Sequence, residues 1–97
     1  MVVISKTVIV NFGKNHADVT KPLNDWWKVT KNADWTSLKD IKKNFNSVDY
    51  VGNDRYVFNI KGNKYRLVAM IFFDIRTVFI RYIGKHADYN KTDCTII

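Results

Sequence analysis

The pattern of hydrophobic and polar residues changes near residue 50. Before it, apolar side chains recur three and four positions apart, the spacing that places them on one side of a helix. After it, apolar runs rich in β-branched and aromatic residues alternate with short polar turns, as strands do. The chain is therefore expected to fold as an α+β domain, with two to three helices packed on a three- to four-stranded, mainly antiparallel sheet.

The first two expected helices follow one another closely. The first covers residues 5–15, with Ser5 as its cap. The second starts at Asp18 or Thr20, because Pro22 then falls in the first turn, where its missing N–H is tolerated. The second helix carries a stripe of large side chains, Leu23, Trp26, Trp27 and Thr30, at the spacing of a core-facing helix. The alternative, that the two indoles stack on nucleobases, is less favoured by this regular spacing.

A third, short helix is expected over residues 36–43, with Thr36 as its cap. Its buried side is marked by Leu38, Ile41 and Phe45. The side chains that lie away from it are Lys39, Lys42 and Lys43. Such lysines more often form a solvated surface than a contact with phosphates.

The second half reads as a strand meander. Residues 55–61 and 64–73 flank Gly62-Asn63, a pair suited to a two-residue hairpin turn with positive φ. A third strand is expected at residues 77–83, and Gly84 is expected to end it. The strand 64–73 is apolar at both parities beyond Arg66, which places it in the centre of the sheet, with residues 2–4 as a candidate edge strand.

The composition adds a strong positive charge. The 97 residues are expected to form one domain, residues 1–97, because a single core typically occupies about 100–150 residues. Sixteen basic side chains oppose nine acidic ones, a net charge of +7 that is spread evenly over both halves. This charge favours a polyanionic partner such as nucleic acid or an anionic membrane surface. All nine acids are aspartates, so a mechanism that needs a glutamate as general base is excluded.

The sequence lacks the residues that disulfide bonds, zinc sites, nucleotide-binding loops and serine nucleophiles require. Cys94 is the only cysteine, so it has no disulfide partner within the chain, and with His16 and His86 it falls short of the four ligands of a structural zinc site. No phosphate-cradling loop, dinucleotide fingerprint or serine-nucleophile motif is present. No metal or cofactor is expected. Without a signal-like start or an apolar run near the ~18–20 residues that span a bilayer, the expected location is the cytoplasm.

Two arginines are expected in the middle of strands. By alternation, Arg66 shares a face with Val68, Met70 and Phe72. Arg81 is expected to share a face with Phe79 and Ile83. A guanidinium among apolar neighbours requires a partner. Two interpretations stay open: Asp74 or another aspartate pairs with Arg66, or Arg66 faces an open surface and binds a phosphate, which its planar fork suits.

Further polar residues cluster near the ends of these strands. Lys61 and Lys64 flank the expected hairpin turn, at the mouth of the same sheet as Arg66. After the last strand, Lys85 is followed by His86 and Tyr89, which one turn of helix would place on one side. A surface histidine beside a packed tyrosine is the more common explanation of such a pair.

Two segments carry a close resemblance to a known family: residues 51–69, VGNDRYVFNIKGNKYRLVA, and residues 78–90, VFIRYIGKHADYN. Shorter matches at residues 3–6 and 31–35 extend the likeness over most of the chain. Together these segments resemble the HigB toxin family of the RelE superfamily. The resemblance implies a RelE-like fold and a ribosome-dependent endoribonuclease, the toxin of a type II toxin–antitoxin module. It further implies that translated mRNA is cut without metal or cofactor, and that a helix-turn-helix antitoxin of the HigA type neutralises the toxin.

In the chemistry that this resemblance implies, the ribose 2′-OH attacks the adjacent phosphate, so the protein aligns the attack, moves protons and stabilises the phosphorane. Arg66 is then expected to stabilise the transition state, His86 to act as general acid, and Tyr89 to orient the RNA or share the proton transfer. Phosphate binding is expected of Lys61, Lys64, Arg81 and Lys85. The general base is left open between a lysine, His86 and ribosomal RNA.

Two other classes of protein fit the same charge. A non-catalytic basic RNA-binding module would bind with a steep salt dependence and cut nothing. An interaction protein would use its charge only for an acidic partner.

Overall fold

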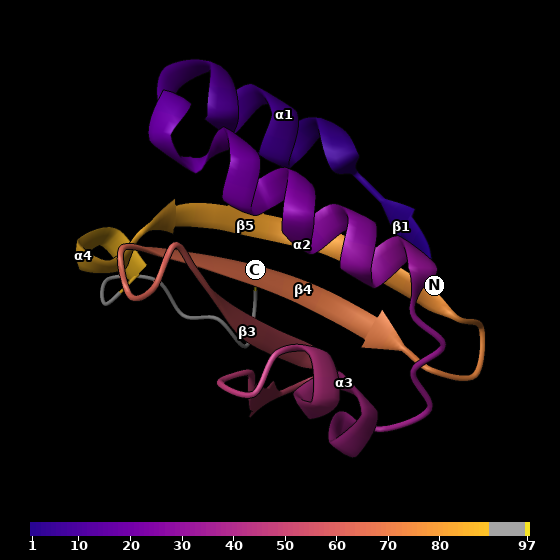
Figure 1. Cartoon of the computed structure of the whole chain (residues 1–97). Coiled ribbons are helices and arrows are strands. Elements are labelled where there is room, and N and C mark those ends of the chain that lie inside the picture. Colours follow the sequence, from indigo (N-terminus) through magenta and orange to yellow (C-terminus); the bar gives the residue numbers. More distant parts are fainter. Residues whose placement is uncertain (90–96) are drawn as a thin grey trace.

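The computed structural model describes residues 1–89 and residue 97, with only the backbone for Asp88 and Tyr89; Cys94 lies outside the described residues. The elements, shown in Figure 1, are β1 (Val2–Ile4), α1 (Lys6–Asn15), the 3-10 helix η1 (Ala17–Val19), α2 (Thr20–Asn32), α3 (Leu38–Asn44), β2 (Asp49–Gly52), β3 (Arg55–Ile60), β4 (Tyr65–Phe72), β5 (Thr77–Lys85) and α4 (His86–Tyr89). The expected α+β architecture is confirmed. None of the helices formed by these residues has the length and apolar content needed to cross a bilayer.

The described strands form one five-stranded sheet in the order β1-β5-β4-β3-β2. β1 runs parallel to β5, and all other neighbours are antiparallel. The central place of β4 and the edge position of residues 2–4 are confirmed. The sheet has one strand more than the largest number expected. The additional strand, β2, was not predicted because it is short, contains no buried residue and is interrupted between Tyr50 and Gly52, where Gly52 has a φ of 100°.

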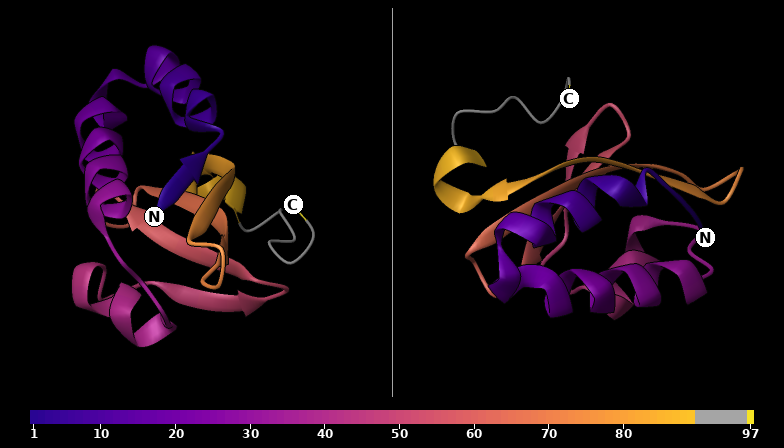
Figure 2. Two further views of the ribbon diagram at one scale, coloured as in Figure 1. Left: turned by 90° about the vertical axis from the view of Figure 1, so that its right-hand side faces the viewer. Right: turned by 90° about the horizontal axis from the view of Figure 1, so that it is seen from above.

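All three longer helices lie on one side of the sheet, as the left panel of Figure 2 shows. The main core fills the space between them and the strand side chains that point toward them, which in β4 are Tyr65, Leu67, Ala69 and Ile71. Trp26 is 1% exposed and packs edge-to-face on Phe58 of β3. The core interpretation of the tryptophan stripe is therefore confirmed.

The expected side-chain caps are wrong. α1 does begin after Ser5, but Ser5 has a φ of 70° and makes no capping hydrogen bond. Neither Asp18 nor Thr20 caps α2, since Asp18 lies in η1 and the Thr20 hydroxyl donates to a carbonyl of α1. Thr36 donates instead to the carboxylate of Asp40, 2.7 Å away. The side chains of Asp18, Thr20 and Thr36 each bind another partner, which leaves them unable to cap.

The hairpin between β3 and β4 is present, but its expected two-residue turn is wrong. The last paired residues are Ile60 and Tyr65, so the turn spans Lys61–Lys64. The N–H of Lys64 donates to the Lys61 carbonyl at 3.3 Å, and positive φ values occur at Lys61 (53°) and Gly62 (64°). Gly62 thus has the positive φ that the sequence pattern assigned to it, whereas Lys61 has a positive φ in place of Asn63.

A β-bulge in β5 corrects the expected placement of Arg81. The pairing of β5 with β4 shifts between Val68 and Ala69, whose partners are Tyr82 and Ile80, so Arg81 is the extra residue. Ile83 consequently joins the main core, whereas Phe79 packs on Phe72 on the opposite face. The prediction that Arg81, Phe79 and Ile83 share one face is wrong, because a bulge inserts one residue into the alternation.

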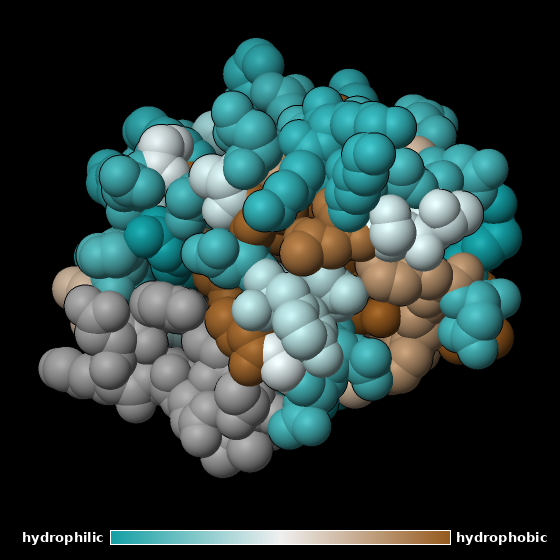
Figure 3. All heavy atoms as spheres, turned by 90° about the horizontal axis from the view of Figure 1, so that it is seen from below, coloured by the Kyte–Doolittle hydropathy of each residue, from teal (hydrophilic) through white to brown (hydrophobic). Residues whose placement is uncertain are grey.

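The lysines of α3 are solvent-exposed. Figure 3, viewed from below, shows mainly hydrophilic residues on the part of the molecule that carries this helix, with hydrophobic residues at the surface between them. Lys39, Lys42 and Lys43 are exposed, and the Lys43 ammonium lies 3.6 Å from the Asp40 carboxylate. Exposure of these three side chains is expected both for a solvated surface and for a contact with phosphates, so both interpretations stay open.

Candidate functional site

The face of the sheet opposite the three longer helices is here called the open face. Its side chains alternate along each strand with those of the main core. β4 contributes Arg66, Val68, Met70 and Phe72, as predicted from the sequence. Cross-strand pairing adds, from β3 and β5, Arg55, Val57, Asn59, Phe79, Tyr82 and Gly84, together with Arg81 of the bulge. The open face thus combines three arginines with aromatic side chains.

Arg66 lies half-buried near one end of the open face. Its cross-strand partners are Asn59 on β3 and Gly84 on β5. Its guanidinium donates to the main-chain oxygen of Asn63 at 3.4 Å and of Tyr65 at 3.5 Å, within its own strand and turn. Asp74, considered as a partner from the sequence, instead accepts the N–H of Ile75 at 3.1 Å.

His86 lies at the same end of the sheet as Arg66. It opens α4 directly after β5, and its N–H donates to the Lys64 carbonyl at 3.0 Å, which ties it to the start of β4. It follows Gly84, the partner of Arg66, by two residues. The helical turn predicted for His86 and Tyr89 is confirmed for the backbone, while the side chain of Tyr89 lies outside the description.

Gly84 lies inside β5 and does not end it, contrary to the expectation. A Cβ added there would overlap the hydroxyl and ring of Tyr82. The phenol of Tyr82 therefore lies across the backbone of Gly84, on the side of the strand that faces away from the core. Because Gly84 pairs with Arg66, this absence of a side chain brings the phenol beside the arginine.

Arg55 and Arg81 meet at a single oxygen atom. The main-chain oxygen of Ile97 accepts one hydrogen bond from Nη2 of Arg55 at 3.0 Å and another from Nε of Arg81 at 3.1 Å. The Ile97 side chain packs on a small apolar cluster of the open face, formed around Val57 and Val68. The two guanidinium groups thus converge from strands on either side of β4.

Lys61 and Lys64 lie at the hairpin turn and bind Asp18. Their ammonium groups are 3.1 and 2.7 Å from the same carboxylate oxygen, and the hydroxyl of Tyr65 donates to it as well. The hydrogen bonds from Lys64 and Lys61 hold the pKa of Asp18 far below its ordinary value, and Asp18 in turn raises the pKa of Lys64. Since Tyr65 belongs to the helical side, the structure separates these lysines from the open face.

Replacing Asp18 with Asn is expected to destabilise the fold in a pH-dependent manner. The pKa of this carboxyl is lowered in the folded state from 3.8, so its stabilising contribution is full above that value and is lost as the pH falls through the folded pKa. Urea unfolding at neutral pH should therefore show a less stable variant, and the difference should shrink below about pH 4. Asp25→Asn, which breaks only an exposed pair with Lys21, is the control and should change little. A difference for Asp18 that stays constant with pH would contradict the assignment.

The structure thus divides the seven residues singled out from the sequence. Arg66, Arg81 and His86 are brought to the open face or its end, together with the backbone of Tyr89. The cross-strand partner of Lys85 is Tyr65, which places Lys85 on the helical side of the sheet end, away from Arg66. Lys61 and Lys64 form ion pairs with Asp18. Arg55, Asn59 and Tyr82 also lie on this face and were not predicted. The register of the predicted hairpin pairs Asn59 with Arg66 and places Arg55 on the same face, whereas no sequence pattern indicates Tyr82.

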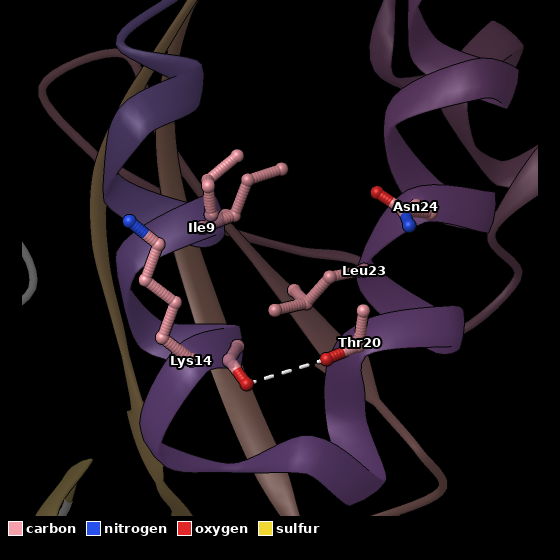
Figure 4. Close-up of a pocket in the computed structure, with 7 residues that line it drawn as sticks. Ile9, Lys14, Thr20, Leu23 and Asn24 are labelled. Atoms are coloured by element: carbon pink, nitrogen blue, oxygen red, sulfur yellow. Dashed lines mark hydrogen bonds between the residues drawn. The ribbon is translucent and has the colours of Figure 1, made fainter.

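Two pockets formed by the described residues lie away from this surface, and one of them, of about 380 Å³, is lined by residues of β1 and α2. The other pocket, of about 360 Å³, lies between α1 and α2 on the helical side, and Figure 4 shows it bounded by side chains of both helices, with Lys14 as its single ionisable group. Within the described ranges, no three His, Cys, Asp or Glu side chains gather as metal ligands would. The open face is the strongest candidate for the functional surface.

Known proteins match the segments that build this surface. Residues 19–92 match the HigB toxin family, described as the RelE-like toxic component of a toxin–antitoxin system. The chain is 27% identical over 93 residues to the mRNA interferase HigB of Escherichia coli O6:H1, covering 94% of this chain and 90% of that protein. It is 37% identical over 54 residues to the mRNA interferase toxin HigB of Escherichia coli K12, covering 56% of this chain and 51% of that protein. The family match includes β2–β5, the strands that carry the three arginines of the open face, and the chain therefore belongs to the HigB family of RelE-like toxins.

Proposed function

We propose that this chain is an mRNA interferase, the toxin of a type II toxin–antitoxin module, and that it cuts mRNA during translation on the ribosome. The observation that carries the proposal is the open face, where Arg66 and Arg81 lie on the side of the sheet opposite the three longer helices and His86 lies at its end. This surface offers cationic and proton-transferring groups to an extended polyanion. The names of the curated relatives, mRNA interferases, support the same reaction.

In the proposed reaction the 2′-oxygen bonds to phosphorus and the bond from phosphorus to the 5′-oxygen breaks. Arg66 stabilises the negative charge that grows on the phosphorane oxygens, for which a guanidinium fork is well shaped. His86 gives its proton to the departing 5′-oxygen, and Tyr89 orients the RNA or assists that transfer. Arg81 holds a phosphate beside the reacting one. The products are a 2′,3′-cyclic phosphate and a 5′-hydroxyl.

The proton of the 2′-OH goes to a lysine, to His86 or to ribosomal RNA. Lys64 is the weakest of these candidates, because Asp18 raises its pKa and keeps it protonated. Lys61, Lys64 and Lys85 instead serve phosphates outside the cut site. Two ammonium groups share one carboxylate at the hairpin turn, which leaves that cluster with a net positive charge.

A toxin of this family acts opposite an antitoxin. We expect the antitoxin to be a helix-turn-helix protein of the HigA type, and the complex to form in the cytoplasm, where the ribosomes are. The antitoxin provides the decisive genetic control, since a binding module without catalytic activity would need none.

The proposal is tested by inducing the gene alone and together with a neighbouring helix-turn-helix gene. Induction alone should stop growth, and primer extension should reveal new 5′ ends within translated reading frames. Co-expression should restore growth. A non-catalytic RNA-binding module predicts neither the arrest nor the rescue, so normal growth on induction would favour that alternative.

Gly84→Ala is expected to impair cleavage more than it impairs folding. The added Cβ displaces the phenol of Tyr82, which is the tip of a movable side chain, so the free energy of unfolding should fall by only about 1 kcal/mol or less. The displaced ring leaves its place beside Arg66, and cleavage should fall several-fold. Urea unfolding and cleavage of ribosome-bound mRNA are the two measurements.

Gly62→Ala is the matched control, in which stability and not cleavage should be lost. Its φ of 64° is strained for alanine, at a cost of about 1–2 kcal/mol, whereas nothing lies within 4 Å of the added Cβ. Gly62→Ala should therefore lose stability and keep its cleavage activity. Equal losses of activity in both variants would show that the position of Tyr82 does not matter.

A further inference from the structure

We propose that Arg55 and Arg81 form a second phosphate-binding site for single-stranded RNA on the open face, next to the cut site at Arg66, and that Ile97 occupies it in the absence of RNA. The proposal rests on the proposed function and extends it, because it names where a flanking phosphate binds. It adds Arg55, a residue that the sequence analysis did not select.

The geometry of the pair is that of an anion site. Two guanidinium groups from β3 and β5 donate to one oxygen atom, at 3.0 and 3.1 Å. Groups of like charge held this close repel each other unless an acceptor stands between them. The main-chain oxygen of Ile97 occupies the place that a phosphate oxygen would take, and a phosphate would bring the negative charge that suits a guanidinium pair best.

Arg55 is held rigidly for this role. Its Nη1 donates to the main-chain oxygen of Asn53 at 2.8 Å, which fixes the orientation of the guanidinium plane. Its Nε is buried without a hydrogen-bond acceptor among the residues that the structure describes. A buried donor without an acceptor is costly, and a ligand with several oxygens can satisfy more of the donors of the pair than one main-chain oxygen does.

The position of the pair along the sheet suits a neighbouring phosphate. Arg81 is inserted beside Tyr82, whose partner is Val68, two residues along β4 from Arg66. At a rise of about 3.3 Å per residue, this is roughly 7 Å along the strand, a distance that one nucleotide of an extended RNA strand can span. An RNA strand lying along β4 could therefore place one phosphate at Arg66 and another at the Arg55–Arg81 pair.

The neighbouring side chains favour RNA over an acidic peptide. Phe72 and Phe79 pack edge-to-face on this face with ring centres 5.8 Å apart, both half-buried, and Tyr82 lies nearer to Arg66. Aromatic rings beside cationic groups form the pattern that binds single-stranded nucleic acid, because bases stack on the rings while the cations follow the backbone.

The experiment measures how salt affects binding of a short, fluorescein-labelled single-stranded RNA with O-methylated 2′-hydroxyls, which cannot be cut. Arg55→Gln and Arg81→Gln should each weaken binding several-fold at low salt. Each should also reduce the slope of log K against log salt by about 0.7, the value for one lost phosphate contact on a single strand. Lys21→Gln, on the outer surface of α2, is the control and should keep the slope of the unmodified chain.

Ile97→Gly is expected to strengthen RNA binding, whereas the two glutamine variants weaken it. It removes the side chain that packs on Val57 and Val68, so Ile97 competes less and RNA should bind more tightly with the slope unchanged. Arg55→Lys keeps the charge and should keep the slope, which separates loss of the contact from loss of folding. Slopes for both glutamine variants equal to that of Lys21→Gln would overturn the proposal.

The outcomes also separate this proposal from the proposed function. A chain that binds RNA with the expected slopes and cuts no mRNA would refute the nuclease function and leave the phosphate site standing. If the chain cuts mRNA but the salt slopes of both glutamine variants are unchanged, the nuclease function stands and the phosphate site is refuted. Weaker capture of the antitoxin by Arg55→Gln, with RNA binding unaltered, would assign the pair to a protein interface and overturn the proposal.

Discussion

Arg66→Ala is expected to lower the rate of mRNA cleavage by about 10²–10³-fold, the usual effect of removing one group that stabilises the charge of a transition state. Arg66 lies half-buried at the end of the open face and is the arginine paired with Gly84, near His86. Because negative charge on the phosphorane oxygens grows only as the 2′-oxygen attacks, the loss should appear in the rate of the chemical step rather than in ribosome binding. Single-turnover cleavage of ribosome-bound mRNA measures it.

Two variants make the Arg66 result specific. Arg66→Lys keeps the charge and loses the planar fork, so it should recover only part of the rate. Arg76→Ala removes an arginine at the opposite end of β4 and β5, where the guanidinium pairs with Asp34, and it should cleave at the normal rate. An Arg66→Ala variant as active as Arg76→Ala would remove Arg66 from the mechanism.

His86→Ala is expected to slow cleavage by about 10²–10⁴-fold, the range for loss of a general acid. The prediction follows from the position of His86, whose N–H donates to the Lys64 carbonyl and so holds it beside the start of β4. His16→Ala is the matched control because His16 is the other histidine of the chain and stacks on Phe12 of α1, on the helical side. Cleavage by His16→Ala should stay within a few-fold of normal.

A modified substrate separates proton donation by His86 from other roles. An mRNA with sulfur in place of the 5′-oxygen at the cut site has a leaving group that needs no proton. On this substrate the rates of His86→Ala and the unmodified chain should become nearly equal. If the large difference persists, His86 acts otherwise, for instance by positioning the RNA.

The parts of the fold that follow from local periodicity could be predicted from the sequence. The apolar run after Arg66 placed β4 in the centre of the sheet, and the stripe containing Trp26 placed α2 on the core, because burial on one side is written directly into the spacing. The face of Arg66 follows from the same alternation. These features need no knowledge of distant partners.

The parts that failed depend on partners far away in the chain. Asp18 was expected to cap a helix, but its carboxylate meets ammonium groups 43 and 46 residues later. The bulge at Arg81 arises where β5 pairs with β4, and neither strand shows it alone. The meeting of Arg55 and Arg81 with Ile97 joins residues 42 and 16 positions apart. No local pattern carries such information.

The placement of all three longer helices on one side of the sheet affects how mutations abolish the activity of such a toxin. Most residues that stabilise the fold lie between those helices and the sheet, whereas the arginines proposed to act on RNA lie on the other side. Substitutions of partly exposed side chains there change stability little. Under selection against toxicity, harmless variants should therefore accumulate on the open face, and they should remain folded proteins that still sequester the antitoxin.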